Sequence, residues 1–229
     1  MFVAEVASIF FGATLIAGLG LSVGLFLKFT HETKTKGRKR APYLTLSYVL
    51  GAGTMIFLTT AAACFLTILI VPIIPYHIWF CLVLASLLVA GALVIWRYHR
   101  PDKDTVTLWL PRPVAKFLAE RAENTRSEVE AFSLGVSSIV FELPFSAPVF
   151  FATALVILEF TGLTVALPLA FSLAAIFPLI LLWIKLKHNT NSAAIHKWRL
   201  KHKRFFQVLL GSYYFVFALF LFVFFGGIW

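Results

Sequence analysis

The stretch from Tyr43 to Ile70, YLTLSYVLGAGTMIFLTTAAACFLTILI, contains no charged residue and decides the fold class. A helix needs about 20 apolar residues to cross a hydrocarbon core of about 30 Å, so this run is long enough to span a membrane. Further charge-poor runs of similar length lie at 6–27, 78–96, 131–158, 163–184 and 205–228. Continuous apolar runs are typical of helices and differ from the short alternating segments of transmembrane strands. The sequence therefore predicts an all-α integral membrane protein with six transmembrane helices.

The overall composition excludes the common classes of soluble protein. Of the 229 residues, 60% are hydrophobic and 13% are charged, whereas a soluble domain carries about 25% charged residues. Two cysteines are too few for a disulfide-rich scaffold. The net charge of +10 is divided among short segments beside the predicted helices, where anionic lipid headgroups explain it. We therefore expect the lipid bilayer, and no nucleic acid, as a partner.

The basic residues predict the orientation of the chain in the membrane. All 20 lysines and arginines lie between the first and second, the third and fourth, or the fifth and sixth spans. The segments on the opposite side and both chain ends contain none. Because lysine and arginine are concentrated in cytoplasmic loops, we expect these three segments to be cytoplasmic. Both termini would then be extracytoplasmic, in a cell (inner or plasma) membrane.

One cytoplasmic segment is long enough to have structure of its own. From Pro101 to Glu130 it mixes both signs of charge. Just after Pro113, a favoured first-turn residue, apolar residues recur at helical spacing. These residues are Val114, Phe117, Leu118 and Ala122. The pattern predicts a short amphipathic helix on the cytoplasmic face, either a plain connector or a docking site for a membrane or cytoplasmic protein.

The six spans divide into two units of three helices, residues 1–97 and 131–229, joined by the cytoplasmic segment 98–130. Because three is odd, the second unit must be inverted relative to the first, as in many transporters. Aligning residue 12 with residue 135 gives weak support, since it places Gly12-Ala13-Thr14 on Gly135-Val136-Ser137. We therefore predict two inverted three-helix repeats.

The middle of the fourth span holds the most informative residues, Phe141-Glu142-Leu143-Pro144-Phe145-Ser146-Ala147-Pro148. Pro144 and Pro148 each remove a backbone donor, which predicts a kink or an opening in the helix. Glu142 lies about eleven residues, or roughly 16 Å, from the cytoplasmic end of the span. A charged group near the bilayer centre costs at least ~2.5 kcal/mol and needs polar partners or water. We therefore expect Glu142 to face the interior between the two halves.

Two interpretations of Glu142 stay open. It is either a neutral glutamic acid that hydrogen-bonds a neighbouring helix or an ion- or proton-coupled residue on a transport pathway. Glycines of the first span either permit close packing or loosen the helix, so the first and fourth spans are the two that could be broken. The residues predicted to line the pathway are Glu142, Pro144, Phe145, Ser146, Pro148, Gly18 and Gly20.

A family resemblance rests on three stretches. Phe132-Ser133-Leu134-Gly135 followed by Leu143-Pro144-Phe145-Ser146-Ala147-Pro148 resembles the fourth helix of the CcdA/DsbD transmembrane proteins. The stretch from Arg40 to Gly51 is similar to that family's second helix, and Arg204 to Phe217 to its last. The resemblance implies six helices, two inverted halves and both termini outside. It also implies membership of a broader group that includes small-solute exporters of the LysE type.

The chain departs from that family at the reactive positions. The family carries one redox cysteine in its first helix and one in its fourth, whereas here the first span has none and Phe145 stands where the second would be. Thiol–disulfide exchange requires sulfur. Cys64 and Cys81 lie in the second and third spans, as a bridged pair or as two inert apolar residues.

These features lead us to expect a transporter or permease for a small solute or ion, with alternating access around a midplane site at the first and fourth spans. The alternative is a CcdA/DsbD-like redox or cytochrome c biogenesis-type protein, or a non-transporting subunit of a membrane complex. The sequence contains no nucleophile–base constellation, metal-ligand spacing or phosphate loop. We therefore expect no catalytic residue, no metal and no cofactor, and we do not expect an enzyme.

Overall fold

The computed structural model describes residues 2–19, 21–35, 41–70, 77–97, 112–158, 160, 165–187, 198 and 201–225. Within these ranges the regular structure is helical, and the helices are α1 (Phe2–Leu19), α2 (Leu21–Thr35), α3 (Ala41–Ile70), α4 (His77–Arg97), α5 (Arg112–Asn124), α6 (Glu128–Leu158), α7 (Ala166–Lys187) and α9 (Lys203–Phe225). Five of them, α3, α4, α6, α7 and α9, are long and apolar enough to cross a membrane, and the bent pair of α1 and α2 makes a sixth if the two helices form one span. The prediction of an all-α protein with several membrane spans is confirmed.

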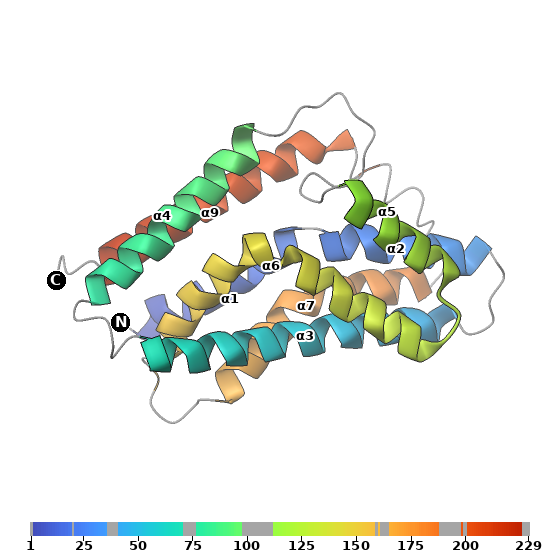
Figure 1. The fold of residues 1–229 in the computed structure, drawn as a ribbon, viewed down its shortest axis with the longest axis horizontal. Coiled ribbons are helices and arrows are strands. Elements are labelled where there is room, and N and C mark those ends of the chain that lie inside the picture. The colour runs from blue at the N-terminus through green and yellow to red at the C-terminus, as the bar shows by residue number, and fades with distance from the viewer. Residues whose placement is uncertain are drawn as a thin grey trace.

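The helix ends that flank the three basic segments lie on one side of the bundle (Figure 1). In this view α2, α4 and α7 end, and α3, α6 and α9 begin, towards the upper and right-hand side. The opposite ends of the same helices lie towards the left. The segments that carry the basic residues therefore connect to one end of the bundle, as their distribution along the chain predicts.

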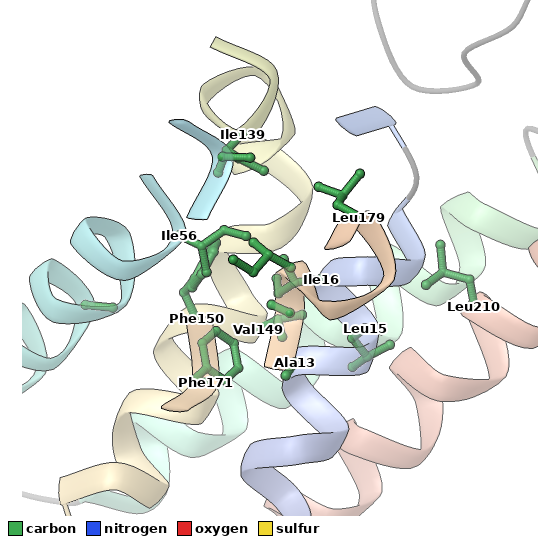
Figure 2. Close-up of a cluster of buried hydrophobic side chains, with 14 of the residues drawn as sticks. Ala13, Leu15, Ile16, Ile56, Ile139, Val149, Phe150, Phe171, Leu179 and Leu210 are labelled. Atoms are coloured by element: carbon green, nitrogen blue, oxygen red, sulfur yellow. The ribbon is translucent and has the colours of Figure 1, made fainter. Parts of the chain in front are cut away.

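Four helices, α1, α3, α6 and α7, pack around a common apolar core. Figure 2 shows the centre of this core, where Ala13 of α1, Ile56 of α3 and Phe171 of α7 surround Val149 and Phe150 of α6. All five side chains are almost completely buried. The core therefore ties the two halves of the sequence together through α6.

The contact between α3 and α6 is the most extensive in the bundle. A Cβ atom added at Gly51 of α3 would overlap the carbonyl oxygen of Phe132, and one added at Gly135 of α6 would overlap that of Tyr48. Small residues allow two helix backbones to approach this closely. One glycine from each helix thus sets the separation of α3 and α6.

The α4 helix packs mainly against α9, and this pair lies alongside the four-helix core (Figure 1). Gly211 of α9 makes room for the indole of Trp96, which a Cβ atom at that position would overlap. Gln207 of α9 also donates a hydrogen bond to the carbonyl oxygen of Ile95 at 2.7 Å. Specific contacts between helices distant in sequence therefore position the last span.

The first span is divided into two helices. The axes of Val6–Gly18 and Ser22–His31 differ in direction by 47°, so the prediction that this span could be broken is confirmed. Glycine tolerates a local change in backbone direction better than other residues, and Gly18 is the last residue of the first segment. Gly20 lies outside the described residues.

The fourth span is one continuous helix. Pro144 and Pro148 both lie inside α6, whose ribbon bends part-way along its length (Figure 1). Each proline deprives the carbonyl four residues earlier of its usual donor, but the flanking turns stay helical. Of the two alternatives predicted at these prolines, a kink or an opening, α6 shows a bend and no division.

The amphipathic helix predicted after Pro113 is α5. Leu118 and Ala122 are buried where α5 meets α2 and α6, and Val114 is half-buried. Phe117 was predicted on the same apolar face but is 48% exposed, with the Arg121 guanidinium above its ring. The buried face is therefore narrower than the sequence pattern suggests.

Candidate functional site

Glu142 lies in the interior of the bundle, with 5% of its surface exposed. Among the aspartate, glutamate, lysine, arginine and histidine side chains whose burial the structure describes, it is the one that is buried. Its Oε1 atom accepts a hydrogen bond of 2.9 Å from the backbone N–H of Ser22. The prediction that Glu142 faces the interior and not the lipid is confirmed, and its carboxyl group joins α6 to the broken first span.

The partner of Glu142 is the start of a helix, since Ser22 is the second residue of α2. The first four N–H groups of a helix have no partner within the helix, and the helix dipole places partial positive charge at this end. A break inside a membrane span exposes such groups where water is scarce. Glu142 supplies both an acceptor and a negative charge, so the break in the first span and the buried carboxylate stabilise each other.

Tyr48 of α3 bonds the carbonyl group of the same residue, Ser22. The Tyr48 hydroxyl donates a hydrogen bond of 2.8 Å to the carbonyl oxygen of Ser22. The rings of Phe26 and Phe29 pack on Tyr48 with centroid distances of 5.5 and 6.0 Å. The first turn of α2 is thus bonded to α6 through an N–H group and to α3 through a carbonyl group.

Two further hydrogen bonds lie along the proline-containing part of α6. The Ser146 hydroxyl donates to the carbonyl oxygen of Glu142 at 3.0 Å. The Tyr214 hydroxyl of α9 donates to the carbonyl oxygen of Phe145 at the same distance. The carbonyl groups that lose their usual donor to Pro144 and Pro148 are those of Val140 and Pro144, so these two side-chain bonds are made to other carbonyl groups of the same stretch. They also attach α9 to the stretch of α6 that carries Glu142.

The residues predicted to line a pathway in α6 do not share one environment. Glu142 and Ser146 are buried, and Phe145 and Pro148 are half-buried. Pro144 is exposed, so its contribution is to the backbone of α6 and not to an interior surface. The structure therefore brings together Glu142, Ser146 and the Phe145 carbonyl, and leaves the Pro144 ring outside this group.

Of the two glycines of the first span that were predicted to line a pathway, the structure describes Gly18. Gly18 is exposed, and a Cβ atom placed there would lie 3.2 Å from Leu210 Cδ1 of α9. This position corresponds to helix packing, one of the two roles that the sequence left open. Gly20 again lies outside the described residues.

Three polar residues of this region were not singled out as site residues from the sequence, namely Ser22, Tyr48 and Tyr214. The two tyrosines carried a usable signal, because a tyrosine inside an apolar run must find a partner for its hydroxyl when it is buried. Ser22 carried none, since its contact with Glu142 is made by the backbone N–H and not by the side chain.

No protein-family model, curated protein or solved structure matches the chain. The resemblance to the CcdA/DsbD proteins therefore stays a prediction based on the residues quoted above.

The two cysteines are both buried and free. Cys64 lies on α3 and Cys81 on α4. Of the two arrangements left open by the sequence, the structure has the unbridged one. Thiol chemistry in this protein would have to use these two separate apolar residues.

Proposed function

We propose that the protein is a secondary transporter or permease for a small solute or ion, with its site where the broken first span meets α6. The observation that carries the proposal is the hydrogen bond from Ser22 N to Glu142 Oε1. It places a buried ionisable group against the start of a half-helix. Transporters commonly build their sites from discontinuous helices near the bilayer centre, and ionisable residues within membrane spans commonly mark ion or proton pathways.

Proton exchange at Glu142 provides the coupling in this proposal. When the carboxylate is ionised, it accepts the Ser22 N–H bond and complements the positive end of α2. When it is protonated, the charge is lost and α2 is held less tightly to α6. Movement of the start of α2 would then also break the bond from the Tyr48 hydroxyl to the Ser22 carbonyl oxygen. The start of α2 thus moves relative to α6 and exposes the site to alternate sides of the membrane.

The helix contacts support the second part of the proposal, two inverted repeats formed by residues 1–97 and 131–229. In such a repeat α1 with α2, α3 and α4 correspond to α6, α7 and α9. The contact of α3 with α6 then has a counterpart in that of α7 with α1, and the contact of α4 with α6 in that of α9 with α1. Rocking of one repeat against the other is a common route to alternating access.

Flux measurements with purified protein in liposomes test the proposed function. Amino acids, metal ions and thiols are offered as solutes in the presence of a pH gradient, with protein-free liposomes as the control. Protein-dependent movement of a solute supports transport, and no movement of any of them rejects it. A Cys64→Ala/Cys81→Ala variant tests the redox alternative. Loss of flux in a well-folded double variant would favour thiol chemistry, and unchanged flux would exclude a role for these thiols.

The orientation of the chain in the membrane can be tested separately. In the Cys64→Ala/Cys81→Ala background, we expect a membrane-impermeant maleimide to label Ile73→Cys on intact cells and to leave Thr190→Cys unlabelled. The reason is that position 190 lies in a basic segment and position 73 in a segment without basic residues. Permeabilised cells should label at both positions. Labelling of Thr190→Cys on intact cells would contradict a cytoplasmic location for the basic segments.

A further inference from the structure

We propose that α5 is a latch that is fixed to α6 and holds the half-helix α2 against the bundle. The latch comprises α5 and the turn 125–127 that joins it to α6. The inference rests on the proposed function, in which α2 is the moving element. It gives α5 a role in gating, beyond those of a connector or a docking site.

The α5 helix packs more extensively against α2 than against α6. Its inward face carries the buried residues Leu118 and Ala122. Its outward face carries Lys116 and Glu120, which are exposed and form an ion pair of 3.7 Å. The apolar face of this amphipathic helix is therefore used within the chain itself.

The far end of α2 carries polar residues, of which two threonines are buried and His31 is exposed. Thr30 and Thr33 are both inaccessible to solvent. Their hydroxyl groups donate within α2, to the carbonyl oxygens of Phe26 at 2.8 Å and of Thr30 at 3.0 Å. Because both acceptors lie within α2, the two hydroxyl groups keep their hydrogen bonds when α2 moves. Among the helices that contact α2, α5 makes the most extensive contact.

Several hydrogen bonds fix the junction between α5 and α6. Ser127 and Glu130 form a capping box, in which Glu130 N donates to Ser127 Oγ at 3.2 Å and Ser127 N donates to Glu130 Oε2 at 3.1 Å. Arg126 N also donates to Glu130 Oε2, at 2.7 Å. Beyond the turn, the Arg121 guanidinium donates to Ser133 Oγ of α6 at 3.1 Å. The orientation of α5 is therefore set by α6.

These contacts mean that α6 holds α2 at two places. Glu142 bonds the start of α2, and α5, which is bonded to α6, packs against α2. Protonation of Glu142 frees only the first of these contacts. Movement of α2 therefore also requires α5 to move away from it. A substitution that weakens the packing of α5 should expose α2 even when Glu142 is intact.

The test uses a reporter cysteine on α2 and needs no transported solute. Thr33→Cys is introduced into the Cys64→Ala/Cys81→Ala background, and its rate of reaction with a maleimide is measured in nanodiscs. In this background Leu118→Ala should raise the rate by about tenfold, because loss of a buried contact favours local opening. The matched control is Lys116→Ala, which removes an exposed side chain from the outward face of the same helix and should leave the rate unchanged.

A milder variant covers the case in which Leu118→Ala does not fold. Ser133→Ala removes only the bond to Arg121 and should raise the rate by about threefold, in line with the loss of one hydrogen bond. Equal rates in the wild-type, Ser133→Ala and Leu118→Ala backgrounds would reject the latch and leave transport at Glu142 standing. A failed flux experiment would reject transport without altering the labelling result, so the two failures can be told apart.

Discussion

Replacing Gly135 with leucine should leave almost no folded protein. A Cβ atom at this position overlaps the carbonyl oxygen of Tyr48, and a backbone atom cannot move aside as the end of a side chain can. Overpacking typically costs about 1–3 kcal/mol, and more where backbones must separate. Here the affected contact is the most extensive in the bundle. The yield of monodisperse protein in detergent and its melting temperature measure the effect, and Gly135→Ala should already lower the melting temperature.

The matched control for this substitution is Gly18→Ala. The added methyl group would meet only Leu210 Cδ1, at 3.2 Å, which is the flexible end of a side chain. Alanine is also a better helix former than glycine, so stability should stay close to that of the wild type. If Gly135→Leu melted at the wild-type temperature, the close approach of α3 and α6 would not be what holds the bundle together.

Substitutions of Glu142 should separate its structural role from its proposed role in transport. Glu142→Leu leaves the Ser22 N–H without this acceptor at the start of α2, which should cost about 1–3 kcal/mol and abolish flux. Glu142→Gln keeps an oxygen acceptor but cannot ionise. This variant should melt near the wild-type temperature and still bind solute, but its flux should no longer depend on pH. Melting in detergent and flux at a series of pH values check both expectations.

Ser146→Ala provides the control for the Glu142 variants. Ser146 is buried on the same helix, and its hydroxyl donates to the carbonyl oxygen of Glu142, so the change removes a hydrogen bond without altering the carboxyl group. The pH dependence of flux should persist in this variant. Wild-type behaviour of Glu142→Gln at every pH would instead favour the first interpretation, in which Glu142 is a neutral group that only holds two helices together.

The sequence predicts the spans well because their length and flanking charge both follow from the bilayer. The second span was expected at 43–70 and is the helix Ala41–Ile70, and the fifth was expected at 163–184 and is Ala166–Lys187. The burial of Glu142 could be predicted for a similar reason. A carboxyl group at that depth is tolerated only with partners, whichever partners the fold provides.

The partner itself could not be predicted, because the donor is a backbone N–H that becomes available only where the first span is broken. The sequence marked two spans as candidates for a break, one by its glycines and one by its prolines. In α6 the helix stays whole around both prolines, and the Tyr214 hydroxyl of α9 bonds the Phe145 carbonyl oxygen that lies between them. The outcome thus depended on contacts between helices that local sequence does not encode. The exposure of Phe117 could not be predicted from the sequence either, because the rotation of α5 about its axis depends on its junction with α6.

The pairing of α4 with α9 has a consequence for how the chain is made. The ribosome completes α4 well before it reaches α9. Until then α4 lies in the bilayer or beside the insertion machinery, and the groups that contact α9 in the folded protein lack that partner. These groups include the Trp96 indole and the Ile95 carbonyl oxygen. Insertion of helices and their later association are separable stages in membrane proteins. A chain truncated before Lys203 would insert its earlier spans and still lack the main partner of α4. Synthesis of α9 is therefore the earliest point at which α4 acquires its main partner.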